Sequence, residues 1–250
     1  MSLIRGAIYG LSAAAIWGGM YVVSDIILQI IPPFSLLSLR LILGSMVLLA
    51  LATWQMGGIK ALVFSGKETL LLLGVGILGF GISLGAQFVG TDLSSAINGS
   101  LITSASPAFI LIFATLILRE RLTALTLLAV ALATLGVIII VNPASAEFSS
   151  ASFAGDIALA LAALTWGLYS VLVRRVSHGR DTLIVTLYAL IGGLFITLPA
   201  SVFELAQKPI HSDAINFAVI LGILYLGVVS TAGAMWLWNR AFALVPAATA

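Results

Sequence analysis

Two ionisable side chains of this 250-residue chain, Asp25 and Arg40, lie inside long apolar runs. A charge within a bilayer costs several kcal/mol unless it is paired or hydrated, so each is a candidate for function or for a structural pair. Asp25 lies about six residues before a turn at Ile31 and Arg40 about nine after it, so two antiparallel helices would hold them at similar depth. The pair could open as a gate, or Arg40 could bind a substrate carboxylate. The alternative is a salt bridge that only joins two helices.

Aromatic side chains recur at helical spacing in two apolar runs. Trp17 and Tyr21 are spaced i and i+4 with Asp25 at i+8, so we expect them on one helix face. Trp166, Tyr169 and Ser170 form a similar face. Two such faces could line a cavity for amphipathic or aromatic solutes, or they could only pack helices together. Three further tryptophans fit the membrane-interface belt better: Trp54, Trp236 and Trp238.

A polar stretch precedes Pro107 inside another apolar run. Proline cannot donate a backbone hydrogen bond, so we expect a kink here and a carbonyl freed one turn earlier. The polar side chains could line a water-filled cavity or satisfy one another. They are Asn98, Ser100, Thr103, Ser104 and Ser106.

Several kinds of site are not expected. The sequence has no cysteine, and its histidines, His178 and His211, fall in loops on opposite faces, so we expect no metal and no cofactor. The basic residues are dispersed and the net charge is only +2, which argues against nucleic-acid binding. No phosphate-binding loop is present, and no cluster of ionisable residues suggests an enzyme.

Composition determines the elements that must hold these residues. The chain is 61% hydrophobic and 8% charged, against roughly 25% charged in soluble domains. A membrane helix needs about 20 mostly apolar residues. The sequence predicts an all-α integral membrane protein with eight spans, at residues 6–28, 34–53, 70–89, 95–118, 124–141, 157–173, 182–203 and 217–237.

The basic residues also predict an orientation. With the N-terminus in the cytoplasm, the inner loops carry nine basic residues and the outer loops carry Lys208, while Arg40 lies within a span. An excess of this kind in short loops follows the positive-inside rule. We therefore expect a multi-pass protein of the cell membrane, plasma or inner, with a cytoplasmic N-terminus.

The sequence repeats itself at an offset of about 150 residues. Trp17-Gly18 matches Trp166-Gly167, and residues 90–99 align loosely with residues 241–250. Five spans in the first half place the second half in the membrane in the opposite direction, which makes an inverted repeat. The expected units are residues 1–142, with five helices, and residues 154–250, with three helices and the start of a ninth. We expect the chain to be a truncated form, because residues 100–141 have no counterpart.

Residues 104–141, with Ser-x-Pro inside a span, the turn Arg119-Glu120-Arg121-Leu122-Thr123 and Gly136, resemble the helix-four and helix-five signature of EamA-type permeases of the drug/metabolite transporter superfamily. The Trp-Gly pairs, Arg40 and residues 238–241 extend this resemblance to most of the chain. It implies ten helices, as two inverted five-helix repeats around a central cavity, and export of metabolites or amino acids.

These observations favour a secondary transporter that works by alternating access on small metabolites, with amphipathic or aromatic amino acids as the preferred class. Its expected partners are a small solute and membrane lipid, and a homodimer is an open alternative. A non-transporting scaffold, an inactive fragment and, less favoured, an intramembrane enzyme are the other hypotheses. The candidate substrate-binding residues are Trp17, Tyr21, Arg40, Asn98, Ser104, Trp166, Tyr169 and Ser170; Asp25 and Pro107 are candidates for a structural or gating role.

Overall fold

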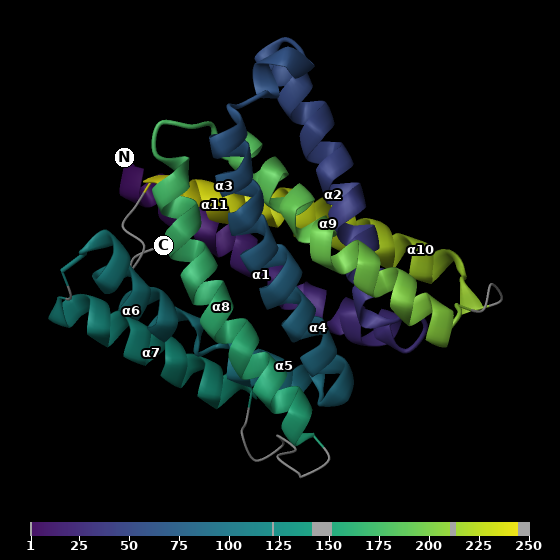
Figure 1. Ribbon diagram of the computed structural model, residues 1–250. Coiled ribbons are helices and arrows are strands. Elements are labelled where there is room, and N and C mark those ends of the chain that lie inside the picture. The colour runs from purple at the N-terminus through teal and green to yellow at the C-terminus, as the bar shows by residue number, and fades with distance from the viewer. Residues whose placement is uncertain (1, 122, 142–151, 211–213, 245–250) are drawn as a thin grey trace.

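The computed structural model describes residues 2–121, 123–141, 152–210 and 214–244, and every regular element in them is a helix (Figure 1). The start of a ninth span, expected at the end of the chain, and His211 fall outside these residues. Within the described residues, seven helical stretches are long and apolar enough to cross a membrane, which confirms an all-α integral membrane fold. The remaining expected span, residues 124–141, forms α7 (Ala124–Val141), an apolar helix of 18 residues.

Two spans of the first half and two of the second half are continuous helices: α1 (Ser2–Leu28), α2 (Pro33–Met56), α8 (Phe153–Ser177) and α9 (Thr182–Gln207). Local sequence explains their ends. Pro33 opens α2, where its missing N–H would have no helical partner, and Gly57, with a φ of 74°, ends it. Asp181 caps α9 by accepting a hydrogen bond of 2.8 Å from the backbone N–H of Leu183.

The third and the last described span each contain a π-helical segment. In the third span, α3 (Gly66–Gly76) continues through η2 (Ile77–Ser83) into α4 (Leu84–Leu93). In the last, α10 (Phe217–Leu224) continues through η5 (Tyr225–Gly233) into α11 (Ala234–Leu244). A π-helical turn widens the helix and changes the direction of the side chains that follow it, and such turns are frequent at functional sites. The two segments begin 148 residues apart, close to the spacing of the sequence repeat.

The fourth span is broken where the sequence predicts a kink. α5 (Ala96–Thr103) ends just before α6 (Ser106–Leu118), and Pro107 occupies the first turn of α6. A short 3-10 helix, η1 (Ile59–Leu62), lies between α2 and α3. In Figure 1, α5, α6 and α7 lie along one side of the molecule, and α5 and α6 pack against α8.

Contacts between the two halves hold the molecule together. α2 packs along α9, η2 packs on α8 and α9, and η5 packs on α1 and α2. Glycines allow the closest crossings: a Cβ on Gly76 would lie 2.1 Å from the carbonyl oxygen of Ala189, and one on Gly192 would lie 2.3 Å from that of Leu73. Small residues at a crossing let helix backbones approach, which is how membrane helices gain packing contacts.

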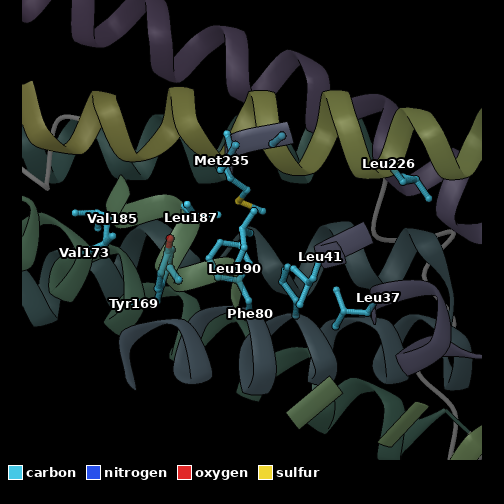
Figure 2. Close-up of a cluster of buried hydrophobic side chains, with 14 of the residues drawn as sticks. Leu37, Leu41, Phe80, Tyr169, Val173, Val185, Leu187, Leu190, Leu226 and Met235 are labelled. Carbon is cyan, nitrogen blue, oxygen red and sulfur yellow. The ribbon is translucent and has the colours of Figure 1, made fainter. Parts of the chain in front are cut away.

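The buried core is formed by side chains from both halves. In Figure 2, Phe80 of η2 lies beside Leu190 of α9 and Leu41 of α2, and Met235 of α11 lies above Leu190. Phe80 has no exposed surface. The π-helical segments therefore lie in the centre of the fold, where each contacts the helices of the opposite half.

Candidate functional site

Arg40 is a cation in the interior of the protein, with none of its surface exposed. α2 directs its side chain at η5, where Nε donates a hydrogen bond of 3.1 Å to Thr231 Oγ1 and Nη2 one of 3.4 Å to Ser230 Oγ. Nη2 also lies 3.3 Å from Met20 Sδ, and the guanidinium carbon lies 5.0 Å from the centre of the Phe88 ring. All these partners are neutral.

Arg40 does not form the ion pair with Asp25 that the sequence left as one alternative. The ion pairs among the described residues are Arg174–Glu120, at 2.5 Å, and Arg180–Glu68, at 2.8 Å. The side chain of Asp25 is exposed, whereas Arg40 is fully buried. Arg40 Nη1 has no hydrogen-bond partner, so the guanidinium keeps a free donor for an anionic group.

The aromatic faces predicted on α1 and α8 meet in one cluster. The Trp17 and Trp166 rings are edge to face, with centroids 5.8 Å apart, and Trp238 of α11 lies 5.2 Å from Trp17 and 6.3 Å from Trp166. Phe80 and Tyr169 extend the cluster, with centroids 5.3 Å apart. Four segments, α1, η2, α8 and α11, therefore contribute rings to a shared aromatic surface.

Ser230 connects the aromatic cluster to the cation. Its carbonyl oxygen accepts a hydrogen bond of 3.1 Å from Trp17 Nε1, while its hydroxyl accepts the bond from Arg40. Ser230 lies in η5, and in the same segment the hydroxyl of Thr231 donates to the carbonyl five residues earlier, at Leu226. The π-helical segment thus presents a carbonyl and two hydroxyls to residues of the first half.

A buried chain of hydrogen bonds begins at Tyr169 of the aromatic cluster. Tyr169 donates its hydroxyl proton to Asn239 Oδ1 at 3.1 Å, and Asn239 Nδ2 donates to Thr186 Oγ1 at 2.8 Å. Thr186 donates in turn to the carbonyl oxygen of Thr182, at 2.7 Å. These groups join α8, α11 and α9, so Tyr169 serves both the aromatic surface and a polar link between helices.

Tyr21 borders a small cavity next to Arg40. Its hydroxyl lies 2.8 Å from Thr103 Oγ1, which ties α1 to α5. The cavity has a volume of about 10 Å3, roughly one water molecule. Met20 and Phe88 lie both on this cavity and against Arg40. The full lining is Met20, Tyr21, Ser24, Leu28, Gln87, Phe88 and Thr91.

The structure places Asn98 away from this centre. Its Nδ2 donates to Asp156 Oδ1 at 3.0 Å and to Ser94 Oγ at 2.9 Å, and Ser94 Oγ donates to the same carboxylate oxygen at 2.7 Å. This network joins the α4–α5 turn to the first turn of α8. Its geometry fits a connection between helices better than a cavity wall.

Two other expected site residues bond locally. Ser104 donates to the carbonyl oxygen of Leu101, and Ser170 donates to that of Trp166. Ser104 lies at the break between α5 and α6, next to Pro107, and Ser170 is fully buried. Both hydroxyls therefore satisfy carbonyls of their own chain segment.

Sequence reasoning missed the contributions of Trp238, Phe80, Ser230 and Thr231. Trp238 was expected in the interface belt, yet its ring is partly buried against Trp17. The direction of all four side chains depends on the π-helical segments, which no simple period in the sequence indicates. For Trp238 the sequence held one signal, because residues 238–241 belong to the stretch that resembles the family.

Among the described residues, no group of three or more His, Cys, Asp or Glu side chains could hold a metal ion. In the part of the chain that the structure describes, the groups gathered at the centre are the Arg40 guanidinium, several aromatic rings and hydroxyl groups. Such a set suits recognition of a solute with an anionic group and an apolar body.

Comparison with known proteins decides the family. The model of the EamA-like transporter family matches residues 4–142 and 153–250, which is nearly the whole chain. The chain belongs to the EamA-like transporter family.

Relatives of this EamA family member carry transporter names. An uncharacterized transporter of Archaeoglobus fulgidus is 26% identical over 227 residues, covering 90% of this chain and 76% of the relative. Two uncharacterized transporters of Bacillus subtilis are also similar. YyaM is 28% identical, covering 83% of this chain and 68% of the relative. YetK is 27% identical, covering 97% of this chain and 73% of the relative. A solved crystal structure matches 95% of this chain and 78% of its own with a TM-score of 0.73 and 20% identity, which supports the fold.

Proposed function

We propose that this EamA family member is a secondary transporter of small metabolites, and that amphipathic or aromatic amino acids are its preferred solutes. The observation that supports this most directly is that Ser230 holds Trp17 and Arg40 side by side. A carboxylate would pair with Arg40, and an apolar or aromatic side chain would lie on the indoles. The hydroxyls and the Gln87 amide of the adjoining cavity supply acceptors for an ammonium group.

The mechanism we propose is alternating access between two inverted repeats. Trp17 and Trp166, which the sequence repeat aligns, are in ring contact, and η2 and η5 begin 148 residues apart, close to the offset of that repeat. Rocking of one half against the other would separate the tryptophans on one side at a time and admit solute. We further propose that the protein lies in the cell membrane with its N-terminus in the cytoplasm, and that it transports the solute without changing it chemically.

Transport by purified protein in liposomes tests the proposal. We expect uptake of labelled amino acids with large apolar or aromatic side chains, and competition by their carboxylate-bearing analogues but not by the corresponding amines. Trp17→Ala should reduce uptake by about tenfold, because the ring contacts of one tryptophan contribute about 1 kcal/mol or more. Trp54→Ala is the matched control, since Trp54 is 84% exposed at the far end of α2.

The outcomes separate the hypotheses. Uptake lost in the Trp17 variant but kept in the Trp54 variant supports a central binding site. Uptake of the amines in preference to the acids would reject Arg40 as the anchor. Absence of uptake for every solute tested, with folded protein in the vesicles, would favour a non-transporting scaffold.

A further inference from the structure

A second cavity is an open groove between α3 and α8 with a volume of about 790 Å3. In Figure 1, α3 and α8 run beside each other, and the start of α3 and the end of α8 lie toward the top of the view. The groove has three basic and six apolar or glycine residues. They are Lys67, Leu70, Leu71, Gly74, Val75, Leu172, Arg175, Val176 and Arg180.

The basic residues gather at one end of the groove. Lys67 is the second residue of α3 and Arg175 lies in the last turn of α8, while Arg180 follows α8 in the turn to α9. Arg180 binds Glu68 at 2.8 Å and the carbonyl oxygen of Val176 at 2.9 Å. Neither ion pair of the described residues involves Lys67 or Arg175, so this end carries a net positive charge.

The rest of the groove is apolar and lies deeper along the same helices. Leu70 and Leu71 are 73% and 50% exposed. Gly74 lies seven residues beyond Lys67, about 10 Å along the helix. A Cβ built on Gly74 would meet no atom within 4 Å, so the groove stays open at this depth.

We propose that this groove binds an anionic phospholipid. The phosphate pairs with Lys67, Arg175 and Arg180, and an acyl chain lies along Leu71, Gly74 and Leu172. A charged end beside an apolar channel matches the two parts of such a lipid, and basic pockets between membrane helices on the cytoplasmic side bind anionic head groups. The orientation proposed above puts the basic end at that side. A second copy of this chain fits less well, because it would have to present acidic groups to this end.

The site is independent of the proposed transport of solutes, so a binding measurement tests it alone. Protein purified in neutral detergent receives equal concentrations of dioleoylphosphatidylglycerol and dioleoylphosphatidylcholine, and native mass spectrometry counts the bound lipids. We expect phosphatidylglycerol to be retained preferentially. The double variant Lys67→Gln, Arg175→Gln should weaken its binding by about 25-fold, because each basic side chain near an anionic lipid surface contributes about fivefold.

A charge-matched control and a steric variant sharpen the test. Arg5→Gln with Arg121→Gln removes two exposed basic residues outside the groove and should leave lipid retention unchanged. Gly74→Leu should displace the acyl chain and reduce retention, whereas Gly74→Ala should not. If Gly74→Leu fails to fold, the charge variants still decide the question.

Three results would overturn the proposal. The first is equal retention of the two lipids by the unmodified protein. The second is unchanged retention in the folded Lys67 and Arg175 double variant. The third is displacement of phosphatidylglycerol by glycerol 3-phosphate at similar concentration, which would mean that the groove binds a soluble anion.

Discussion

Arg40 of α2 and Thr231 of η5, which are 191 residues apart in the chain, are joined by a hydrogen bond of 3.1 Å from Nε to Oγ1. The bond crosses between the two halves of the molecule and brings a cation to the centre without an acidic partner among the described residues. A buried charge that lacks a counter-ion lowers stability. Its presence is explained if it serves the solute rather than the fold.

Replacing Arg40 should therefore reduce transport without reducing stability. Arg40→Met removes the charge and keeps much of the side-chain volume, so we expect thermal stability to be unchanged or higher. Transport should fall by about tenfold or more, because a hydrogen bond to a charged group contributes about 1.5–3 kcal/mol. Thermal unfolding in detergent and uptake in liposomes measure the two effects. Loss of both together would show that Arg40 is mainly structural.

The chain Tyr169–Asn239–Thr186 should be energetically coupled. Asn239→Ala leaves the Tyr169 and Thr186 hydroxyls without their buried partner and should destabilise the fold by about 1–3 kcal/mol. A double-mutant cycle with Tyr169→Phe should give a coupling energy of about 0.5–1.5 kcal/mol, the range usual for hydrogen bonds between membrane helices. Reversible unfolding in mixed micelles provides the free energies. Strict additivity of the two single changes would contradict the coupling.

Two glycines of α3 should differ sharply in their tolerance of a methyl group. Gly76→Ala places a Cβ 2.1 Å from the carbonyl oxygen of Ala189, so we expect α3 and α9 to be forced apart and the yield of monodisperse protein to fall. Gly74→Ala meets nothing and should be neutral, or more stable by up to about 1 kcal/mol. Size-exclusion chromatography and thermal unfolding compare them. Equal behaviour of the two variants would argue against the close crossing.

The absence of cysteine makes the chain a ready background for testing its orientation. Arg121→Cys and Lys208→Cys each introduce one thiol at an exposed position near a helix end. In intact cells, a membrane-impermeant maleimide should label the thiol at position 208, which is expected outside the cell. It should not label the thiol at position 121, which is expected inside. Labelling with the opposite pattern would reverse the proposed topology.

The sequence predicted the membrane spans and the break at Pro107 because both depend on local properties. Length and apolar composition identify a span, and a missing N–H interrupts a helix. Depth could also be estimated by counting residues from a turn, which is why Asp25 and Arg40 were placed at similar levels.

Direction around the helix axis was harder to predict than depth. Asp25 is eight residues after Trp17, and at about 100° per residue it points roughly 80° away from it. That rotation is enough to expose Asp25, while Met20 and Tyr21 face inward. The surroundings of Arg40 and Trp238 also depend on η5, because π-helical turns arise from tertiary packing as well as from local sequence.

The π-helical segment η5 has a consequence for how the gene can change. Each turn of this kind accommodates more residues than an α-helical turn, so loss of a single codon within residues 225–233 could be absorbed by conversion to a regular α-helix. The regular helix would complete nearly the same turn with one residue fewer, so α11 would keep its direction, and Trp238 and Asn239 would keep their partners. The same deletion in a regular α-helix would rotate everything beyond it by about 100°. In the descent of such proteins, a one-residue deletion in η5 would thus change the groups that face Arg40 and Trp17 and leave the rest of the last described span in place.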